Sequence, residues 1–75
     1  MPLVQIFVPA GSLSADMKYD MIQKVTDAVV EAEGKSIVRR YTWVHINEVP
    51  DGGWGMSGKV VTQDAMKKSM EKWNR

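Results

Sequence analysis

The sequence predicts an α/β fold in which two parallel strands flank one long helix. Three observations lead to this prediction: a β-branched apolar run near the start, a long amphipathic helical pattern after it, and a second alternating run in the middle. A strand, a crossover helix and a second strand form a βαβ unit, whose strands are parallel and whose crossover is right-handed. The 75 residues are expected to form one domain, 1–75, with residues 62–75 as a helical extension at its end.

The first strand is expected over residues 3–8, where β-branched and aromatic residues dominate. Alternation divides the strand into two faces, formed by Val4, Ile6 and Val8 and by Leu3, Gln5 and Phe7. Because both faces are largely apolar, we expect the helix to cover one and a further protein layer to cover the other. Pro2 occupies the first strand position, where a missing backbone N–H costs least.

The long helix is expected over residues 15–33, after a loop at 9–13. Ser14 is a suitable N-cap, Asp16 carries a negative charge in the first turn, and Gly34 suits the residue that ends the helix. Its buried stripe is predicted from apolar residues at helical spacing, which are Met21, Ile22, Val25, Ala28, Val29 and Ala32.

The second strand is expected over residues 37–49 and is clearest at 42–47. Its smaller apolar side chains should face the helix, and its larger polar and aromatic side chains should face away: Thr42, Val44 and Ile46 against Trp43, His45 and Asn47. If the strand already extends as far as Arg39, parity places this side chain on the face of Trp43.

Residues 50–58 combine many turn formers with the bulky side chains of Trp54 and Met56. We expect a hairpin-like segment that packs on a neighbouring subunit and helps to wall a pocket there; the alternative is a Gly-rich surface turn. A short strand at 59–61 and a helix at 63–73 should follow. The helix has an apolar stripe that must dock on its own or a neighbouring subunit, formed by Met66, Met70 and Trp73.

Composition restricts the assembly and the partners. A single core is thin at this length, and the chain has no cysteine and one histidine, so neither disulfides nor a structural zinc ion can stabilise it. Oligomerisation is therefore predicted. A net charge of +1 with scattered basic residues argues against nucleic acid as a partner. The first apolar run is too short to span a membrane, and we expect a soluble, cytoplasmic protein.

Several features in this order resemble the tautomerase superfamily, and within it the 4-oxalocrotonate tautomerase group. They are Met-Pro before an apolar strand, Gly11 closing that strand, the long helix, Val-His-Ile-Asn-Glu at 44–48, and Gly-Trp-Gly-Met-Ser-Gly at 53–58. The resemblance covers residues 2–61. It implies dimers that join two such sheets and a symmetric hexamer built as a trimer of dimers, with a dimer or trimer as the alternative. It also implies a small carboxylate substrate and neither a cofactor nor a metal.

The resemblance makes Pro2 the general base. Removal of Met1 would free the secondary amine of Pro2, and burial and nearby cations would lower the amine's pKa until it is neutral near pH 7. The amine would then interconvert the enol and keto forms of a 2-hydroxy or 2-keto unsaturated carboxylate. The alternative for Pro2 is a structural residue that starts a strand.

The substrate carboxylate requires a cationic partner, and here the sequence departs from the family pattern. Ser12 and Trp43 stand where the best-known members carry arginines. Arg39 and Arg40 are the substitutes we predict, and Lys59 is a weaker candidate. The alternative for the two arginines is a solvated basic pair that offsets nearby acids.

Three further residues complete the candidate site. Trp54 should supply an apolar wall that excludes water, and Trp43 should either join it or fill a subunit interface. His45 either polarises a carbonyl or has a structural role.

The competing interpretation of the whole protein is a non-catalytic oligomeric or ligand-binding homologue that lost the arginines. Related enzymes that hydrate or dehalogenate unsaturated acids, or decarboxylate a semialdehyde, are a further alternative.

Overall fold

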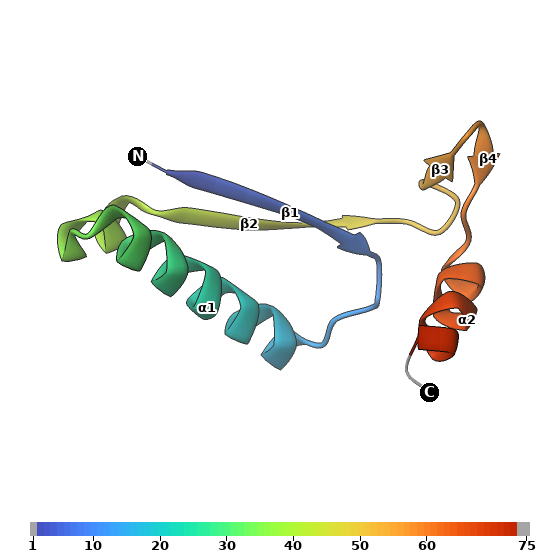
Figure 1. Cartoon of the computed structure of the whole chain (residues 1–75), viewed down its shortest axis with the longest axis horizontal. Coiled ribbons are helices and arrows are strands. Elements are labelled where there is room, and N and C mark those ends of the chain that lie inside the picture. Colours follow the sequence, from blue (N-terminus) through green and yellow to red (C-terminus); the bar gives the residue numbers. More distant parts are fainter. Residues whose placement is uncertain (1, 74–75) are drawn as a thin grey trace.

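The computed structural model describes residues 2–73. Its elements, in chain order, are β1 (Leu3–Pro9), α1 (Ala15–Glu33), the 3₁₀-helix η1 (Ser36–Tyr41), β2 (Trp43–Val49), β3 (Gly55–Met56), β4 (Lys59–Val60) and α2 (Gln63–Trp73). β1 and β2 pair in parallel, α1 runs along one face of their sheet, and the hairpin and α2 lie beyond one end of it (Figure 1). The predicted βαβ unit, hairpin and C-terminal helix are confirmed. Within the described range, no helix is both long and apolar enough to cross a membrane.

The two faces of the β1–β2 sheet differ in exposure as predicted. β1 and β2 pair in register from Leu3 with Trp43 to Pro9 with Val49. The face toward α1 is half-buried, whereas the outer face leaves Leu3, Phe7 and Trp43 exposed by 58%, 57% and 64%. The outer face, with these three large apolar side chains, is therefore uncovered in the protomer.

Helix α1 has the predicted ends but a different buried stripe. The Ser14 hydroxyl accepts a 3.1 Å hydrogen bond from the N–H of Met17, and Gly34 adopts a left-handed conformation with φ 72°. Ala28 and Ala32, predicted to be buried, are exposed, because α1 packs on β2 and η1 rather than centrally over both strands. The half-buried residues are Lys18, Met21, Ile22, Val25, Thr26, Val29 and Val30.

The second strand begins later than predicted. Residues 36–41 form η1, so the expected strand over 37–49 is wrong in its first part. The parallel ladder starts where the N–H of Trp43 donates to the carbonyl oxygen of Pro2. The Thr42 hydroxyl instead donates a 2.8 Å hydrogen bond to the carbonyl oxygen of Val38, which closes the 3₁₀ turn.

The Gly-rich segment makes two tight turns. The N–H of Gly53 donates to the carbonyl oxygen of Pro50 across a turn in which Gly52 has φ 92°. A Cβ on Gly53 would lie 2.7 Å from Cγ1 of Val49 and 2.9 Å from the carbonyl oxygen of Pro50, so a side chain there would force the turn to shift. The hairpin reverses at Ser57 and Gly58, and both have positive φ, the backbone of a type I′ turn.

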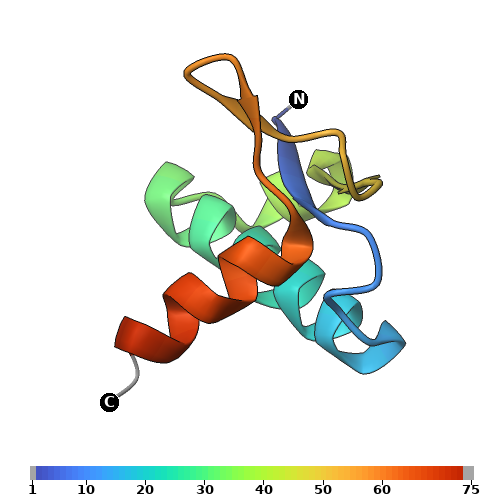
Figure 2. The same ribbon diagram turned by 90° about the vertical axis from the view of Figure 1, so that its right-hand side faces the viewer.

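The protomer does not form a closed core by itself. None of the side chains in residues 2–73 is fully buried. The radius of gyration is 15.5 Å, whereas a compact chain of this length has a radius of about 11 Å. The hairpin and α2 contribute to this, because they extend in different directions from the end of the sheet (Figure 2).

Candidate active site

Pro2 lies half-buried at the start of β1, at the end of the sheet where β2 also begins. Its carbonyl oxygen accepts a 3.0 Å hydrogen bond from the N–H of Trp43. A proline nitrogen has no hydrogen to donate to the ladder, so the carbonyl fixes this residue while its nitrogen takes no part in the sheet. The predicted removal of Met1 falls outside the described residues.

Arg39 and Arg40 lie in the last turn of η1, which leads directly into Trp43 at the same end of the sheet as Pro2. The guanidinium of Arg39 bonds to the carboxylate of Asp27 on α1. Arg40 is exposed and belongs to none of the ion pairs found in residues 2–73. The parity argument for Arg39 was wrong, because this part of the chain is not a strand.

Trp43 and His45 lie on the outer face of the sheet, both exposed and two residues apart on β2. Trp43 is opposite Leu3, and His45 is opposite Gln5. Trp43 therefore lies nearest to Pro2, and His45 lies about 7 Å farther along the sheet, because a strand rises about 3.3 Å per residue.

Trp54 does not meet Pro2 within one protomer. It follows the end of β2, whereas Pro2 lies at the beginning of β1 (Figure 1). The seven residues of β1 span about 23 Å. A site that contains both residues must therefore combine two subunits.

The indole of Trp54 has an unused hydrogen-bond donor. The residue is half-buried, yet its Nε1 atom is shielded from solvent and has no acceptor among the atoms of residues 2–73. The hairpin holds the residue in place, since the carbonyl oxygen of Trp54 accepts a 2.9 Å hydrogen bond from the N–H of Val61. A buried N–H without an acceptor is costly.

Glu48 organises the opposite end of the sheet, a role that the sequence patterns did not predict. Its carboxylate accepts a 3.3 Å hydrogen bond from the N–H of Gly11 and lies 3.2 Å from Nζ of Lys18. The hydrogen bond from Gly11, followed by the interaction with Lys18, lowers the pKa of Glu48 below its usual 4.5. These contacts fix the β1–α1 loop. Position 48 ended the quoted Val-His-Ile-Asn-Glu motif, but spacing alone does not identify its partners.

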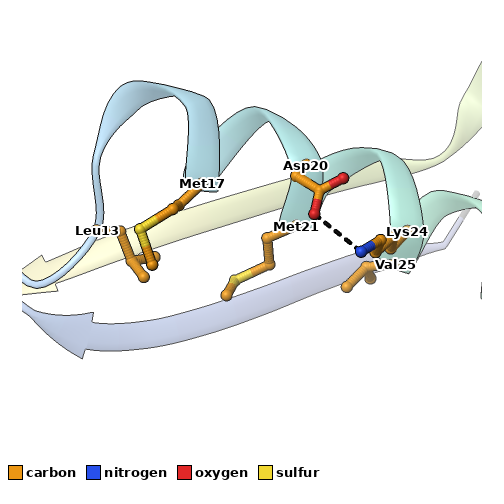
Figure 3. Close-up of a pocket in the computed structure, with 6 residues that line it drawn as sticks. All are labelled: Leu13, Met17, Asp20, Met21, Lys24 and Val25. Carbon is orange, nitrogen blue, oxygen red and sulfur yellow. Dashed lines mark ion pairs between the residues drawn. The ribbon is translucent and has the colours of Figure 1, made fainter.

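Two grooves lie on the described surface. The α1 groove, of about 290 Å³, is lined by Leu13, Met17, Asp20, Met21, Lys24 and Val25. Figure 3 shows the apolar side chains of α1 and of Leu13 in the loop before it pointing toward the sheet, with the 2.9 Å ion pair between Asp20 and Lys24 at the rim. The α2 groove, of about 620 Å³, lies between α2 and the β1–α1 loop and is lined by Pro9, Gly11, Ser12, Gln63, Met66, Lys67, Met70 and Glu71.

Across residues 2–73, no three histidine or carboxylate groups gather closely enough to hold a metal ion. Groups that can take part in proton transfer or anion binding include the amine of Pro2 once freed, His45, the arginines of η1 and the lysines near the loops.

Comparisons with known proteins agree on one family. Residues 2–64 match the family described as tautomerase enzyme. The 2-hydroxymuconate tautomerases of Comamonas testosteroni and Pseudomonas putida are each 40% identical over 58 residues, which cover 77% of this chain and 87% of each relative. A 4-oxalocrotonate tautomerase isozyme from Methylibium petroleiphilum superposes with a TM-score of 0.69 at 34% identity, over 87% of this chain and 97% of that one.

Proposed function

The chain belongs to the tautomerase family and is an isomerase, and from this premise we propose that Pro2 is its general base and that 2-hydroxymuconate or a similar 2-hydroxydienoate is its substrate. The observation that carries the proposal is the position of Pro2. Its carbonyl begins the parallel ladder, and its nitrogen is left out of it. Once Met1 is removed, that nitrogen is a secondary amine held at a fixed place.

The proton transfer follows from this geometry. The neutral amine takes the proton from the 2-hydroxyl group of the dienol while the electrons shift to form the 2-keto group. The same amine then returns a proton to a carbon of the former diene. A neutral amine at pH 7 requires an apolar or cationic surrounding that disfavours the ammonium form. Trp43, which bonds to Pro2 through the backbone, supplies apolar surface at that end of the sheet.

We propose Arg40 rather than Arg39 as the arginine that binds the substrate. Both residues lie at the end of the sheet where Pro2 lies, but the guanidinium of Arg39 already forms an ion pair with the carboxylate of Asp27. A guanidinium can bind a carboxylate with two parallel hydrogen bonds and can also stabilise the negative charge on the developing enolate oxygen.

The proposed site is shared between subunits. Trp54 lies at the far end of the sheet from Pro2, so it can cover only the amine of a neighbouring protomer. The uncovered outer face and the absence of a closed core in residues 2–73 both favour an oligomer. We propose a hexamer built as a trimer of dimers, by analogy with the group that the chain resembles. Cytoplasmic location stays a prediction.

The test is enol-to-keto conversion of 2-hydroxymuconate, followed by absorbance, with protein whose intact mass shows that it begins at Pro2. Conversion by this protein, and its loss in protein that retains Met1, would support the proposal. Equal rates in the two preparations would exclude Pro2 as the base. If neither converts 2-hydroxydienoates or arylenolpyruvates, the proposed substrate class is wrong, and the result favours the non-catalytic ligand-binding alternative.

A further inference from the structure

The α2 groove combines an apolar wall with an ammonium group. Met66 and Met70 supply the apolar wall on one side, the β1–α1 loop forms the other, and Lys67 supplies the charge. The match to the family ends at residue 64, within the first turn of α2, so most of this helix lies outside the matched region.

Helix α2 is held at a defined place against the loop. The side chain of Gln63 donates a 3.0 Å hydrogen bond from Nε2 to the carbonyl oxygen of Ala10. The N–H of Gln63 donates a 2.9 Å hydrogen bond to the carboxylate of Asp51, and the hydroxyl of Thr62 accepts a hydrogen bond from the N–H of Ala65. The end of the groove nearest the loop is therefore held by specific contacts.

The two loop residues that line the groove and carry an N–H, Gly11 and Ser12, already use it. The N–H of Gly11 is bonded to Glu48, and the N–H and hydroxyl of Ser12 both donate to the carbonyl oxygen of Pro9. An anion in the groove must therefore be bound by a side chain. Lys67 is the cationic side chain that lines it.

Two neighbouring lysines are already paired, whereas Lys67 is not. Lys18 contacts Glu48, and Lys68 contacts Asp64 one turn earlier on α2. Lys67 takes part in none of the ion pairs found between residues 2 and 73. Its charge is therefore available to a ligand.

Glu71 also lines the groove and would repel an anion at its outer end. Gln63, Lys67 and Glu71 follow one another at four-residue spacing, which places them on one side of α2, about 6 Å apart along the axis. Because Gln63 is bonded to the loop, Lys67 lies one turn from the loop and Glu71 two turns. The end of the groove nearest the loop thus favours a carboxylate, and the outer end does not.

We propose that Lys67 binds a carboxylate of the substrate while Pro2 of the partner subunit transfers the proton of that same substrate. This inference rests on the proposed function. Within one protomer, the length of β1 separates the two residues. Pro2 precedes the first residue of this strand, and the α2 groove is lined by its last residue, Pro9. The Lys67 ammonium and the Pro2 amine can therefore act on one small substrate only across a subunit boundary.

The free edge of β1 offers the required arrangement. Of the described strands, only β2 pairs with β1, so its other edge is open, and the apolar α1 groove lies beside it (Figure 3). A second copy that pairs there about a two-fold axis runs antiparallel, because an isologous contact places the same segment on both sides. Antiparallel pairing brings the Pro2 end of one β1 to the Pro9 end of the other.

Steady-state kinetics with 2-hydroxymuconate test the role of Lys67. We expect Lys67→Gln to raise KM about tenfold with little change in kcat, because it removes a charge that holds a substrate carboxylate. Lys68→Gln is the matched control, since it removes the same charge from the next residue and should leave KM unchanged. Equal KM values for the two variants would overturn the proposal.

Subunit mixing tests the partner relationship. Protein that retains Met1 supplies Lys67 without a usable amine, and Lys67→Gln supplies the amine without the cation. After both are unfolded and refolded together, the mixed assemblies contain complete sites only if the two groups come from different subunits. Activity at low substrate concentration should then exceed the mean of the separately refolded proteins. No increase, with mixing verified by native mass spectrometry, would overturn the cross-subunit arrangement.

A binding measurement separates failure of this inference from failure of the proposed function. trans,trans-Muconate has the same two carboxylates but no 2-hydroxyl group to ionise, and its affinity can be measured by calorimetry whether or not the protein is active. Weaker binding in Lys67→Gln than in Lys68→Gln supports the Lys67 site even if no 2-hydroxydienoate is converted. Equal binding by the two variants, or no binding by the wild type, overturns it.

Discussion

The N–H of Trp43 donates a 3.0 Å hydrogen bond to the carbonyl oxygen of Pro2, so the residue that we propose as the base is also the first member of the parallel ladder. If Met1 is retained, the nitrogen of Pro2 is part of an amide bond, but the carbonyl oxygen of Pro2 still accepts the hydrogen bond from Trp43. We therefore expect protein that retains Met1 to melt at nearly the same temperature and to lose at least about 100-fold in kcat/KM. A large drop in melting temperature would instead attribute the lost activity to misfolding.

The two arginines of η1 should differ in their effects. Arg40→Ala should lower kcat/KM by roughly 10 to 100-fold, as expected when a hydrogen-bonded charge partner of the substrate is lost. Arg39→Ala should stay near the wild-type rate and cost at most about 1 kcal/mol of folding free energy, because its pair with Asp27 is largely exposed. The reverse order of the two kcat/KM values would contradict the assignment.

Trp54 offers a comparison of two substitutions. Trp54→Phe removes the buried N–H that has no acceptor in residues 2–73, while it keeps most of the apolar surface. We expect it to leave the free energy of unfolding unchanged or to raise it by about 1 kcal/mol. A clear loss of stability would show that the N–H has a partner in the assembled protein.

Trp54→Ala should act on the pH dependence of the reaction. Apolar cover disfavours the protonated amine, so removing it raises the pKa of Pro2. The neutral base then appears only at higher pH. The acid limb of the pH–rate profile should therefore shift to higher pH, whereas Trp54→Phe should leave it in place. An unchanged acid limb in Trp54→Ala would exclude Trp54 from the surroundings of the amine.

Glu48 should make stability depend on pH in the acid range. The hydrogen bond from Gly11 and the contact with Lys18 lower its pKa in the folded protein, so the unfolded chain binds a proton more readily than the folded one. The stabilisation is fully present above the usual value of 4.5 and is lost as pH falls through the lower folded-state pKa. Thermal unfolding between pH 3 and 6 should therefore show a shallower acid decline in Glu48→Gln than in the wild type.

Local sequence patterns predicted the elements that are determined by residues close together in the chain. Alternation located β1, and Ser14 and Gly34 located the ends of α1, because a cap and a left-handed glycine act on adjacent residues. The same reasoning failed at residues 36–41. Ile37 and Val38 have the composition of a strand, but a strand needs a partner, and the ladder with β1 begins only at Trp43.

The candidate site was less predictable because it depends on contacts between distant residues. Gly11 and Glu48 are 37 positions apart, and Gln63 and Ala10 are 53 apart. No spacing rule connects such pairs. The pairing of Arg39 with Asp27 was missed for the same reason, and with it the distinction between the two arginines.

The outer face of the sheet should hold the subunits together, and Phe7 provides a test away from the proposed base. Its side chain is 57% exposed in the protomer and lies on the same uncovered face as Leu3 and Trp43. A charge placed there must be buried without a partner if another subunit covers the face, which costs several kcal/mol per interface. Phe7→Glu should therefore dissociate the assembly into smaller species, as measured by light scattering at micromolar concentration.

Tyr19→Glu is the matched control for this prediction, because Tyr19 is 67% exposed on α1, away from the outer face of the sheet. It introduces the same charge and should leave the molar mass unchanged. If the proposed site includes residues of a subunit that packs on the outer face, Phe7→Glu should also lose activity at low protein concentration and regain it as the concentration rises, by mass action. A Phe7→Glu protein with the wild-type molar mass would show that the outer face is not the interface, whereas a wild-type protein that is already monomeric would exclude the shared site altogether.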